Sequence, residues 1–229
     1  MKLIEMSEMQ KKAVDTFESS GGVVEFFLVD KNGSGECEES YREAAILGLK
    51  ALKQKNNLYF ERLLQLPDYR NRARAEFFDV TIDESEIHGH EISLKEFMGN
   101  NFSIEKRRLM LRGKTPRFLN EYFWVGEEES SKNAIKYSEF NLSGFSGYSD
   151  AFVEPPYNLS GTHQEINKMF WDVANNLFGG FGENCRIWSW STDCSNYFDA
   201  GNEWWGTYFY TYSSLDKSYI VVLFASSTD

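Results

Sequence analysis

The densest group of side chains that could do chemistry lies between Trp188 and Gly206. This stretch of 19 residues contains four of the six tryptophans and three carboxylates, Asp193, Asp199 and Glu203. Carboxylates beside tryptophan rings are typical of sites that bind or cleave carbohydrates, because an apolar wall raises the pKa of one acid. The same oxygens could instead hold a hard cation such as Ca²⁺.

A simpler interpretation of this block is structural. Alternating Trp and Tyr can bury one face of a sheet, while Asp and Asn form the turn between two strands. We favour this interpretation for most of the block, and assign no catalytic residues, metal ligands or cofactor. The candidate binding residues are those expected at the rim of the sheet: Trp190, Asp193, Tyr197, Asp199, Glu203 and Trp205.

Other patterns give weaker indications. His88 and His90 would share one face of a strand, but a closed zinc site needs further ligands, so an exposed loop is favoured. No Gly-x-Ser-x-Gly motif accompanies the serines and histidines, and the glycine-rich runs at 144–147 and 179–182 lack the lysine of a phosphate loop. We therefore expect a binding protein rather than an enzyme.

The charge is unevenly distributed along the chain. Of 229 residues with a net charge of −11, residues 1–117 contribute 19 basic and 20 acidic side chains, and residues 118–229 contribute 5 and 15. An acidic C-terminal half favours a cationic or neutral partner and argues against a dedicated nucleic-acid binder.

Two basic clusters could bind phosphate or an acidic partner. The first is Arg70, Arg72 and Arg74, which share a face if their segment is a strand. The second spans residues 106–117 around Arg108 and Arg112. Solvated faces that neutralise nearby glutamates are the favoured interpretation of both.

Hydrophobic periodicity predicts an α+β fold. The pattern predicts one α+β domain, and the alternative is a division into two lobes, residues 1–125 and 126–229. Ser93 with Glu96, and Thr162 with Glu165, have the spacing of capping boxes. We expect helices at 3–18, 39–55, 58–66, 93–97 and 162–178, and strands at 23–29, 72–83, 121–125, 185–191, 203–213 and 218–226. A C-terminal helix is thus followed by a three-stranded antiparallel meander, with a turn at 215–218. Residues 126–149 are expected to be a loop.

Three cysteines, an odd number, and an N-terminus without a long apolar run predict a reducing, cytoplasmic location. Cys185 and Cys194 could still pair across a turn. No stretch approaches the length of about 18 apolar residues that a spanning helix needs, so we expect no membrane partner.

Several segments of the last 80 residues resemble a family of uncharacterised bacterial proteins. They are Glu154-Pro155-Pro156-Tyr157, the run from Trp190 to Asp193, the block from Tyr197 to Gly206 and the terminal Ala225-Ser226-Ser227-Thr228-Asp229. No activity is established for that family, so the resemblance assigns no functional residue. Small acidic cytosolic proteins of this kind are often immunity proteins to bacterial toxins.

The expected function is therefore protein binding, of an immunity or regulatory type, through an acidic and aromatic C-terminal surface with a basic partner. The alternative is a carbohydrate-binding or glycoside-cleaving protein that uses Asp193, Asp199 and Glu203 with Trp190 or Trp205 as a stacking platform. A third interpretation assigns function to the basic group around Arg108. The sequence leaves the oligomeric state open.

Overall fold

The computed structural model describes residues 1–31, 33, 36–70, 72, 74–113, 121–127, 135–136, 146–182 and 184–227. One set of strands is β1 (Lys2–Ile4), β2 (Glu25–Asp30), β3 (Gly89–Ile92), β8 (Cys185–Trp190), β9 (Thr207–Ser214) and β10 (Tyr219–Ser226). A second is β4 (Phe102–Ser103), β5 (Arg108–Arg112), β6 (Tyr122–Gly126) and β7 (Ile135–Lys136). The helices are α1 (Glu8–Ser19), α2 (Glu38–Gln65), α3 (Leu94–Met98), α4 (Tyr148–Val153), α5 (His163–Val173) and α6 (Asp199–Trp204). Short helical turns are η1 (Ala75–Phe77), η2 (Glu84–Glu86), η4 (Ala174–Phe178) and η5 (Asn196–Phe198).

Two antiparallel sheets organise these elements. The larger has the strand order β1-β2-β10-β9-β8-β3, and the smaller has the order β4-β5-β6-β7. Because β2 pairs with β10 and β3 with β8, both halves of the chain contribute to the larger sheet. The division between residues 125 and 126 considered from the sequence falls inside β6.

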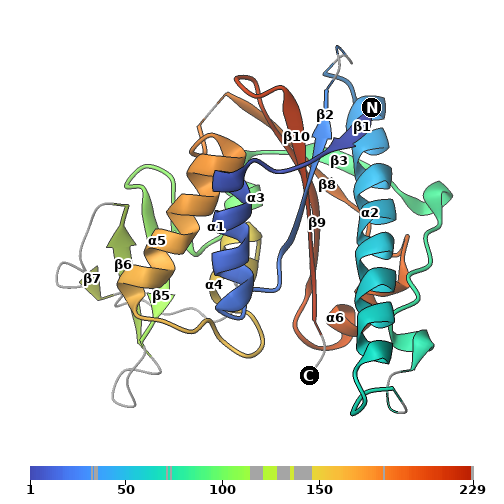
Figure 1. Ribbon diagram of the computed structural model, residues 1–229. Coiled ribbons are helices and arrows are strands. Elements are labelled where there is room, and N and C mark those ends of the chain that lie inside the picture. Colours follow the sequence, from blue (N-terminus) through green and yellow to red (C-terminus); the bar gives the residue numbers. More distant parts are fainter. Residues whose placement is uncertain are drawn as a thin grey trace.

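Helices cover both faces of the larger sheet. α2 lies across one face, α1, α4 and α5 cover the other, and the smaller sheet lies beyond α5 (Figure 1). The buried side chains form two clusters accordingly. One lies between α2 and the sheet and includes Tyr41 and Leu49, and the other surrounds Phe17, Phe152 and Phe170. Among the described helices, none is long and apolar enough to cross a membrane.

The predicted α+β class and C-terminal meander are confirmed. β8, β9 and β10 are neighbours in the sheet, and residues 215–218 form the turn between the last two. Both predicted capping boxes are present. Ser93 and Glu96 start α3, and Thr162 and Glu165 start α5, with each side chain bonded to the other's backbone N–H.

Five predicted elements differ from the structure. The helix expected at 3–18 begins only at Glu8, after a Ser7 cap, because residues 2–4 pair with β2 as an edge strand. The strand expected at 203–213 begins at Thr207, because α6 occupies the preceding residues. The helices expected at 39–55 and 58–66 are one helix, α2. The strand expected at 72–83 is wrong, since the described residues there contain only η1. The loop expected at 126–149 lies mostly outside the described residues, which include β7.

α2 has 28 residues, but only its first half packs on the sheet. Its buried positions all fall between Ser40 and Leu52, at helical spacing. Gly48 allows a close approach, because an added Cβ would lie 2.6 Å from Cγ1 of Val222. Beyond Leu52 the helix passes the end of the sheet and contains no buried residue. It ends before Pro67, which disfavours a helical conformation at the residue before it.

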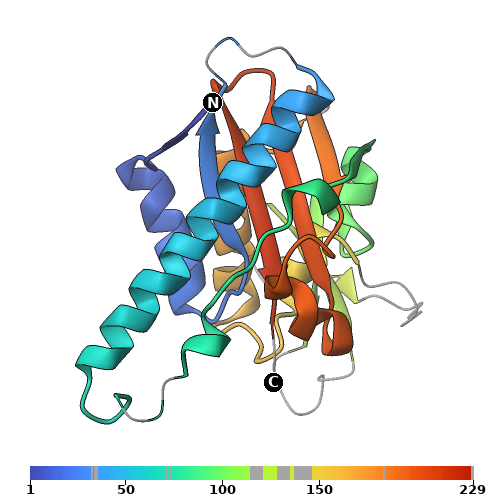
Figure 2. The same cartoon turned by 90° about the vertical axis from the view of Figure 1, so that its right-hand side faces the viewer.

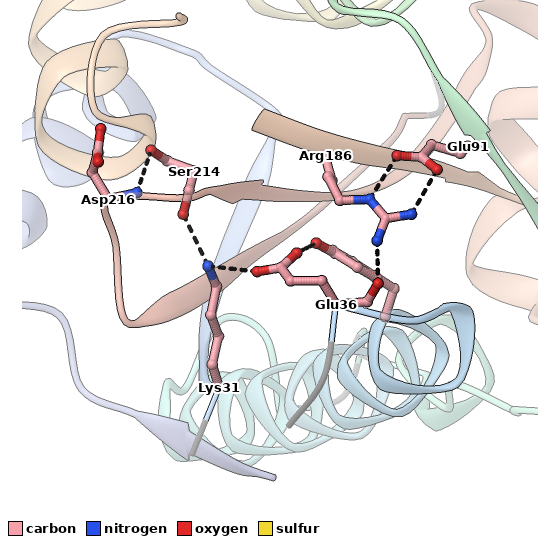
Figure 3. A network of polar contacts seen from close by, with 7 residues as sticks. Lys31, Glu36, Glu91, Arg186, Ser214 and Asp216 are labelled. Carbon is pink, nitrogen blue, oxygen red and sulfur yellow. Dashed lines mark hydrogen bonds and ion pairs between the residues drawn. The ribbon is translucent and has the colours of Figure 1, made fainter. Parts of the chain in front are cut away.

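A polar network attaches the N-terminal end of α2 to the sheet (Figure 3). The Glu36 carboxylate accepts hydrogen bonds from the Tyr41 hydroxyl and from Nζ of Lys31, the latter at 3.1 Å. Nε and Nη2 of Arg186 donate to the two carboxylate oxygens of Glu91 at 2.8 and 2.7 Å, and Nη1 donates to the Glu36 carbonyl. Two-point pairing of this kind has fixed geometry. Polar contacts with the sheet therefore fix the start of α2, whereas the described residues beyond Leu52 have no buried side chain.

Replacing a leucine of α2 by alanine should lower the free energy of unfolding by different amounts in the two halves of the helix. Leu49 is fully buried, whereas 47% of Leu58 is exposed. Leu49→Ala should lower the free energy of unfolding by about 2–5 kcal/mol, because it leaves a cavity against the sheet. Leu58→Ala should change it by about 0.5 kcal/mol or less. Chemical denaturation measures both, and equal losses would contradict the difference in packing between these two positions.

Candidate functional site

The chain between β8 and β9 folds into two consecutive short helices rather than an open loop. Ser195 caps η5 by accepting a hydrogen bond from the Tyr197 N–H, and α6 follows at once. Gly201 permits the tight return into β9, because an added Cβ would lie 2.5 Å from the Gly206 carbonyl oxygen. The predicted binding residues are thereby distributed over two distinct environments.

The two candidate tryptophans lie in packed environments. Trp190 is buried, its ring stacks on Trp188 at 5.7 Å, and its Nε1 donates to Thr211 Oγ1 at 3.0 Å. Trp205 is half-buried and donates from Nε1 to the Glu154 carbonyl oxygen at 2.8 Å. Trp190 therefore presents no free ring face to a ligand, which agrees with the structural interpretation of the aromatic part of the block.

The acidic candidates lie on the surface, and one of them lines a pocket. Asp193, Asp199 and Glu203 are all exposed. Asp199 borders a pocket of about 480 Å³ together with the half-buried Tyr197. Neither Asp193 nor Glu203 is among the described residues that line it. The structure thus brings Asp199 and Tyr197 together and leaves the other two acids outside.

Two further carboxylates in this pocket, Glu76 and Asp79, come from a segment more than a hundred residues earlier. The remaining described lining residues, Asn56, Phe77, Val80, Asn196, Ala200, Ser226 and Ser227, are apolar or neutral. We call this site the acidic pocket. Nζ of Lys53 lies 3.5 Å from a carboxylate oxygen of Asp79. Of the three acids, Asp199 forms no ion pair within the described part of the chain.

Asn196 attaches this early segment to the loop after β8. Its Oδ1 accepts from the Thr81 N–H at 2.8 Å, and its Nδ2 donates to the Asp79 carbonyl oxygen at 2.9 Å. One side chain thus satisfies a donor and an acceptor of a backbone that belongs to no sheet. The N–H of Asp83 adds a bond to the Cys194 carbonyl oxygen at 2.8 Å. These contacts, together with the packing of Phe78 on Phe60, hold Glu76 and Asp79 beside Asp199.

No sequence pattern indicated that these two acids belong to a site. Glu76 and Asp79 lie in the segment that was expected to be a strand, where charged residues look like an ordinary solvated edge. Only the distant pairing through Asn196 makes them part of a site, and nothing in the local sequence indicates that pairing.

The tyrosine and cysteine of the block are protonated groups. The Tyr197 ring packs against Phe198 and Phe224, and its burial raises the pKa of its hydroxyl. Burial, with Asp193 and Asp83 nearby, raises the pKa of the Cys194 thiol to about 11. Cys37, Cys185 and Cys194 are all free thiols, so the pairing of Cys185 with Cys194 is not formed.

A buried carboxyl that the sequence did not single out, Asp150, lies at the opposite face of the larger sheet. It is 6% exposed, accepts from the Tyr208 hydroxyl at 3.0 Å and from Nδ2 of Asn101 at 3.3 Å. Burial raises the pKa of Asp150 to about 6, although the Tyr208 hydrogen bond opposes the shift. The group links α4 to β9.

The remaining sequence candidates do not assemble into a site. His88 and His90 are exposed, and the described residues contain no group of three or more side chains placed to hold a metal ion. In the second basic cluster, Arg107 pairs with Glu127 at 2.8 Å and lies 4.6 Å from the Trp171 ring centroid. Lys114 and Arg117 of that cluster lie outside the described residues.

No protein-family model matches the chain, and neither a curated protein nor a solved structure does. What the protein binds has therefore to be inferred from its own surface.

Removing the Asn196 side chain should loosen the acidic pocket. Asn196→Ala loses two hydrogen bonds to the backbone at 79–81, so the free energy of unfolding should fall by about 1–2 kcal/mol. Proteolysis should also cut sooner near residue 79. Asn57→Ala is the matched control, because Asn57 is exposed on α2. Unchanged stability and cleavage in Asn196→Ala would contradict the role given to this side chain.

Asp150 predicts a specific dependence of stability on pH. Its pKa is raised from 3.8 to about 6 on folding, so the native state binds the proton more tightly than the unfolded state. Its contribution to stability is complete below pH 3.8 and is lost as the pH rises through about 6, a decrease of about 3 kcal/mol. In Asp150→Asn this decrease should be absent. Chemical denaturation from pH 3.5 to pH 8, a range set by those two pKa values, gives the comparison. Parallel curves for the two proteins would contradict the assignment.

Proposed function

We propose that this chain is a protein-binding module, of an immunity or regulatory type, that takes a basic partner at the acidic pocket. The observation that supports the proposal most directly is the grouping of Glu76, Asp79 and Asp199 around one hollow. No lysine or arginine is among its described lining residues. A pocket of about 480 Å³ is large enough for one long basic side chain of a partner.

The apolar part of the same surface supports a protein partner over a small cation. The Phe77 ring at the pocket is 74% exposed. A guanidinium that enters beside the acids could lie over this ring, an arrangement that adds about 0.5–2 kcal/mol of attraction. Exposed aromatic groups next to charges are typical of the few residues that contribute most of the affinity in protein interfaces.

A second pair of exposed aromatic side chains extends this surface beyond α6. Tyr157 is 66% exposed and Trp204 is 51% exposed, and their ring centroids are 6.5 Å apart. Glu203 precedes Trp204 and is exposed as well. Acids and aromatic rings therefore occur on both sides of α6, where Asp199 and Glu203 lie one helical turn apart.

The net charge supports fast association with a basic partner. A chain with a charge of −11 attracts a basic protein over distances of about a Debye length, so binding should weaken as salt increases. We infer a cytoplasmic location from the three free thiols, which are usual in a reducing compartment. We also propose that the chain is a member of the bacterial family that its C-terminal segments resemble.

The carbohydrate alternative has less support. It needs an open tryptophan face beside the acids, whereas Trp190 is buried and Trp205 is hydrogen-bonded to the backbone of Glu154. The aromatic rings that are exposed near the acids, Phe77 and Trp204, belong to a different part of the surface from the predicted platform.

The test compares two neutralised variants with the same change in net charge. Asp199→Asn with Glu76→Gln removes two carboxylates of the pocket, and Asp193→Asn with Glu105→Gln removes two exposed carboxylates outside it. A fluorescent oligo-arginine peptide serves as the basic probe in an anisotropy titration. The pocket variant should bind it about tenfold or more weakly, because a partly enclosed charge pair contributes more than an exposed one.

The control variant should bind the probe within about threefold of the native chain, as expected from a general change in charge alone. Equal weakening in both variants would show that the probe senses only net charge. The pocket would then have no claim to be the binding site.

A further inference from the structure

The far half of α2 and the turn after it form an arm, residues 53–70, that projects past the larger sheet (Figure 2). None of the described residues from 53 to 79 is buried. The large apolar side chains that are exposed on this arm and just after it are Leu58, Tyr59, Leu64, Leu66, Tyr69 and Phe77. Within the described residues, the Phe78 ring packs against the Tyr59 and Phe60 rings, with centroids 5.9 and 5.2 Å apart, while the side chains named above remain exposed. Such a stretch is typical of a contact surface.

The arm has the opposite charge to the rest of the chain. Residues 53–70 contain four basic and two acidic side chains, and Arg72 and Arg74 follow directly, in a protein whose net charge is −11. Lys53, Lys55 and Arg74 have ion-pair partners within the chain. Arg62 and Arg70 are exposed and have no acidic partner in the part of the chain that the structure describes.

The basic arm and the acidic pocket are neighbours on one face. Asn56 of the arm and Phe77 both line the pocket, and in Figure 2 the lower end of α2, the η1 turn and α6 follow one another along the lower edge. Among the described residues, neither Asp199 on α6 nor Arg62 on the arm has an ion-pair partner. This face therefore has a positive end and a negative end, each with a charge that no described residue of the same chain neutralises.

This distribution restricts what can cover the whole face. A uniformly basic partner is repelled by the arm, and an acidic one is repelled by the pocket. Two arms packed against each other would place like charges together. A second copy of this chain, related by a two-fold axis, places the arm of each copy over the acidic pocket of the other. The dimer then contains two equivalent contacts, each of which joins a basic arm to an acidic pocket.

We propose that this face is a self-complementary dimer surface, on which Arg62 and Arg70 of each copy occupy the acidic pocket of the other. The inference rests on the proposed function, because the acidic pocket is the surface that the second copy covers. Dimerisation would then regulate partner binding, since a basic partner has to displace the arm. The exposed leucines and tyrosines of the arm would supply the apolar contact area.

Charge reversal gives a test that distinguishes this dimer from other associations. Arg62→Glu with Arg70→Glu makes the arm acidic, and Glu76→Arg with Asp199→Arg makes the pocket basic. Lys11→Glu with Lys12→Glu makes the same change of charge as the arm variant on the exposed side of α1, and is the control. Sedimentation equilibrium at low and high salt measures the mass of each protein and of mixtures.

The native chain and the control should dimerise at micromolar concentration in low salt and dissociate in high salt. Each reversed variant should be monomeric, with a dissociation constant raised about tenfold or more. An equimolar mixture of the two reversed variants should dimerise again, because both contacts then join opposite charges. A monomeric native chain, a dimeric reversed variant or a mixture that stays monomeric would each overturn the proposal.

Circular dichroism and thermal melting check that the variants are folded, which is expected because the four substituted positions are exposed.

The oligo-arginine titration separates the two proposals. If the native chain is monomeric but the pocket binds the peptide, only the dimer is refuted. If the mixed variants dimerise but the peptide does not bind, the dimer stands and the proposed function fails.

Discussion

The length of α2 is the constraint on which the rest of the structure depends. A helix of 28 residues rises about 42 Å, whereas a strand of eight residues, the longest in the larger sheet, spans about 26 Å. The helix is fixed at its start by the network of Glu36, Arg186 and Glu91, and packed through Gly48 on β10. The far half of the helix therefore extends beyond one end of the larger sheet. The chain has to return from there to the sheet, and this return brings Glu76 and Asp79 beside α6.

The packing of α2 and the path of the chain after it also explain why residues 188–206 lie partly in the core and partly on the surface. Trp188 and Trp190 point from β8 toward the cluster beneath α2, where buried aromatic rings fill the space between helix and sheet. Of the acids that follow, Asp193 lies in the turn before η5, and Asp199 and Glu203 lie on α6, all outside that cluster. Residues adjacent in sequence thus serve two purposes. The tryptophans stabilise the packing of α2. Asp199 lies in a pocket whose other acids, Glu76 and Asp79, belong to the segment that follows α2.

The parts of the fold that could be predicted from the sequence are those determined by short-range chemistry. The capping boxes at Ser93 and Thr162 need residues only three positions apart, and the β9–β10 turn needs a few. The structural interpretation of Trp190 rested on ordinary strand composition. The acidic pocket needed a hydrogen bond between residues 115 apart, Thr81 and Asn196, and no local pattern contains that information. The continuity of α2 was missed because its polar run at residues 53–57 looked like a break between two helices.

Hydrogen–deuterium exchange followed across a dilution series tests most directly whether the face formed by the arm and the acidic pocket is the contact surface of this protein. Amides in residues 53–65 lie on the part of α2 that contains no buried residue, so they should exchange faster than those of the packed half in an isolated chain. We expect exchange in 53–65 and in 196–204 to slow together as concentration rises, and high salt to reverse the change. The described amides of β5 should not respond. Exchange that is independent of concentration and salt in both segments, or a change confined to another face, would contradict it.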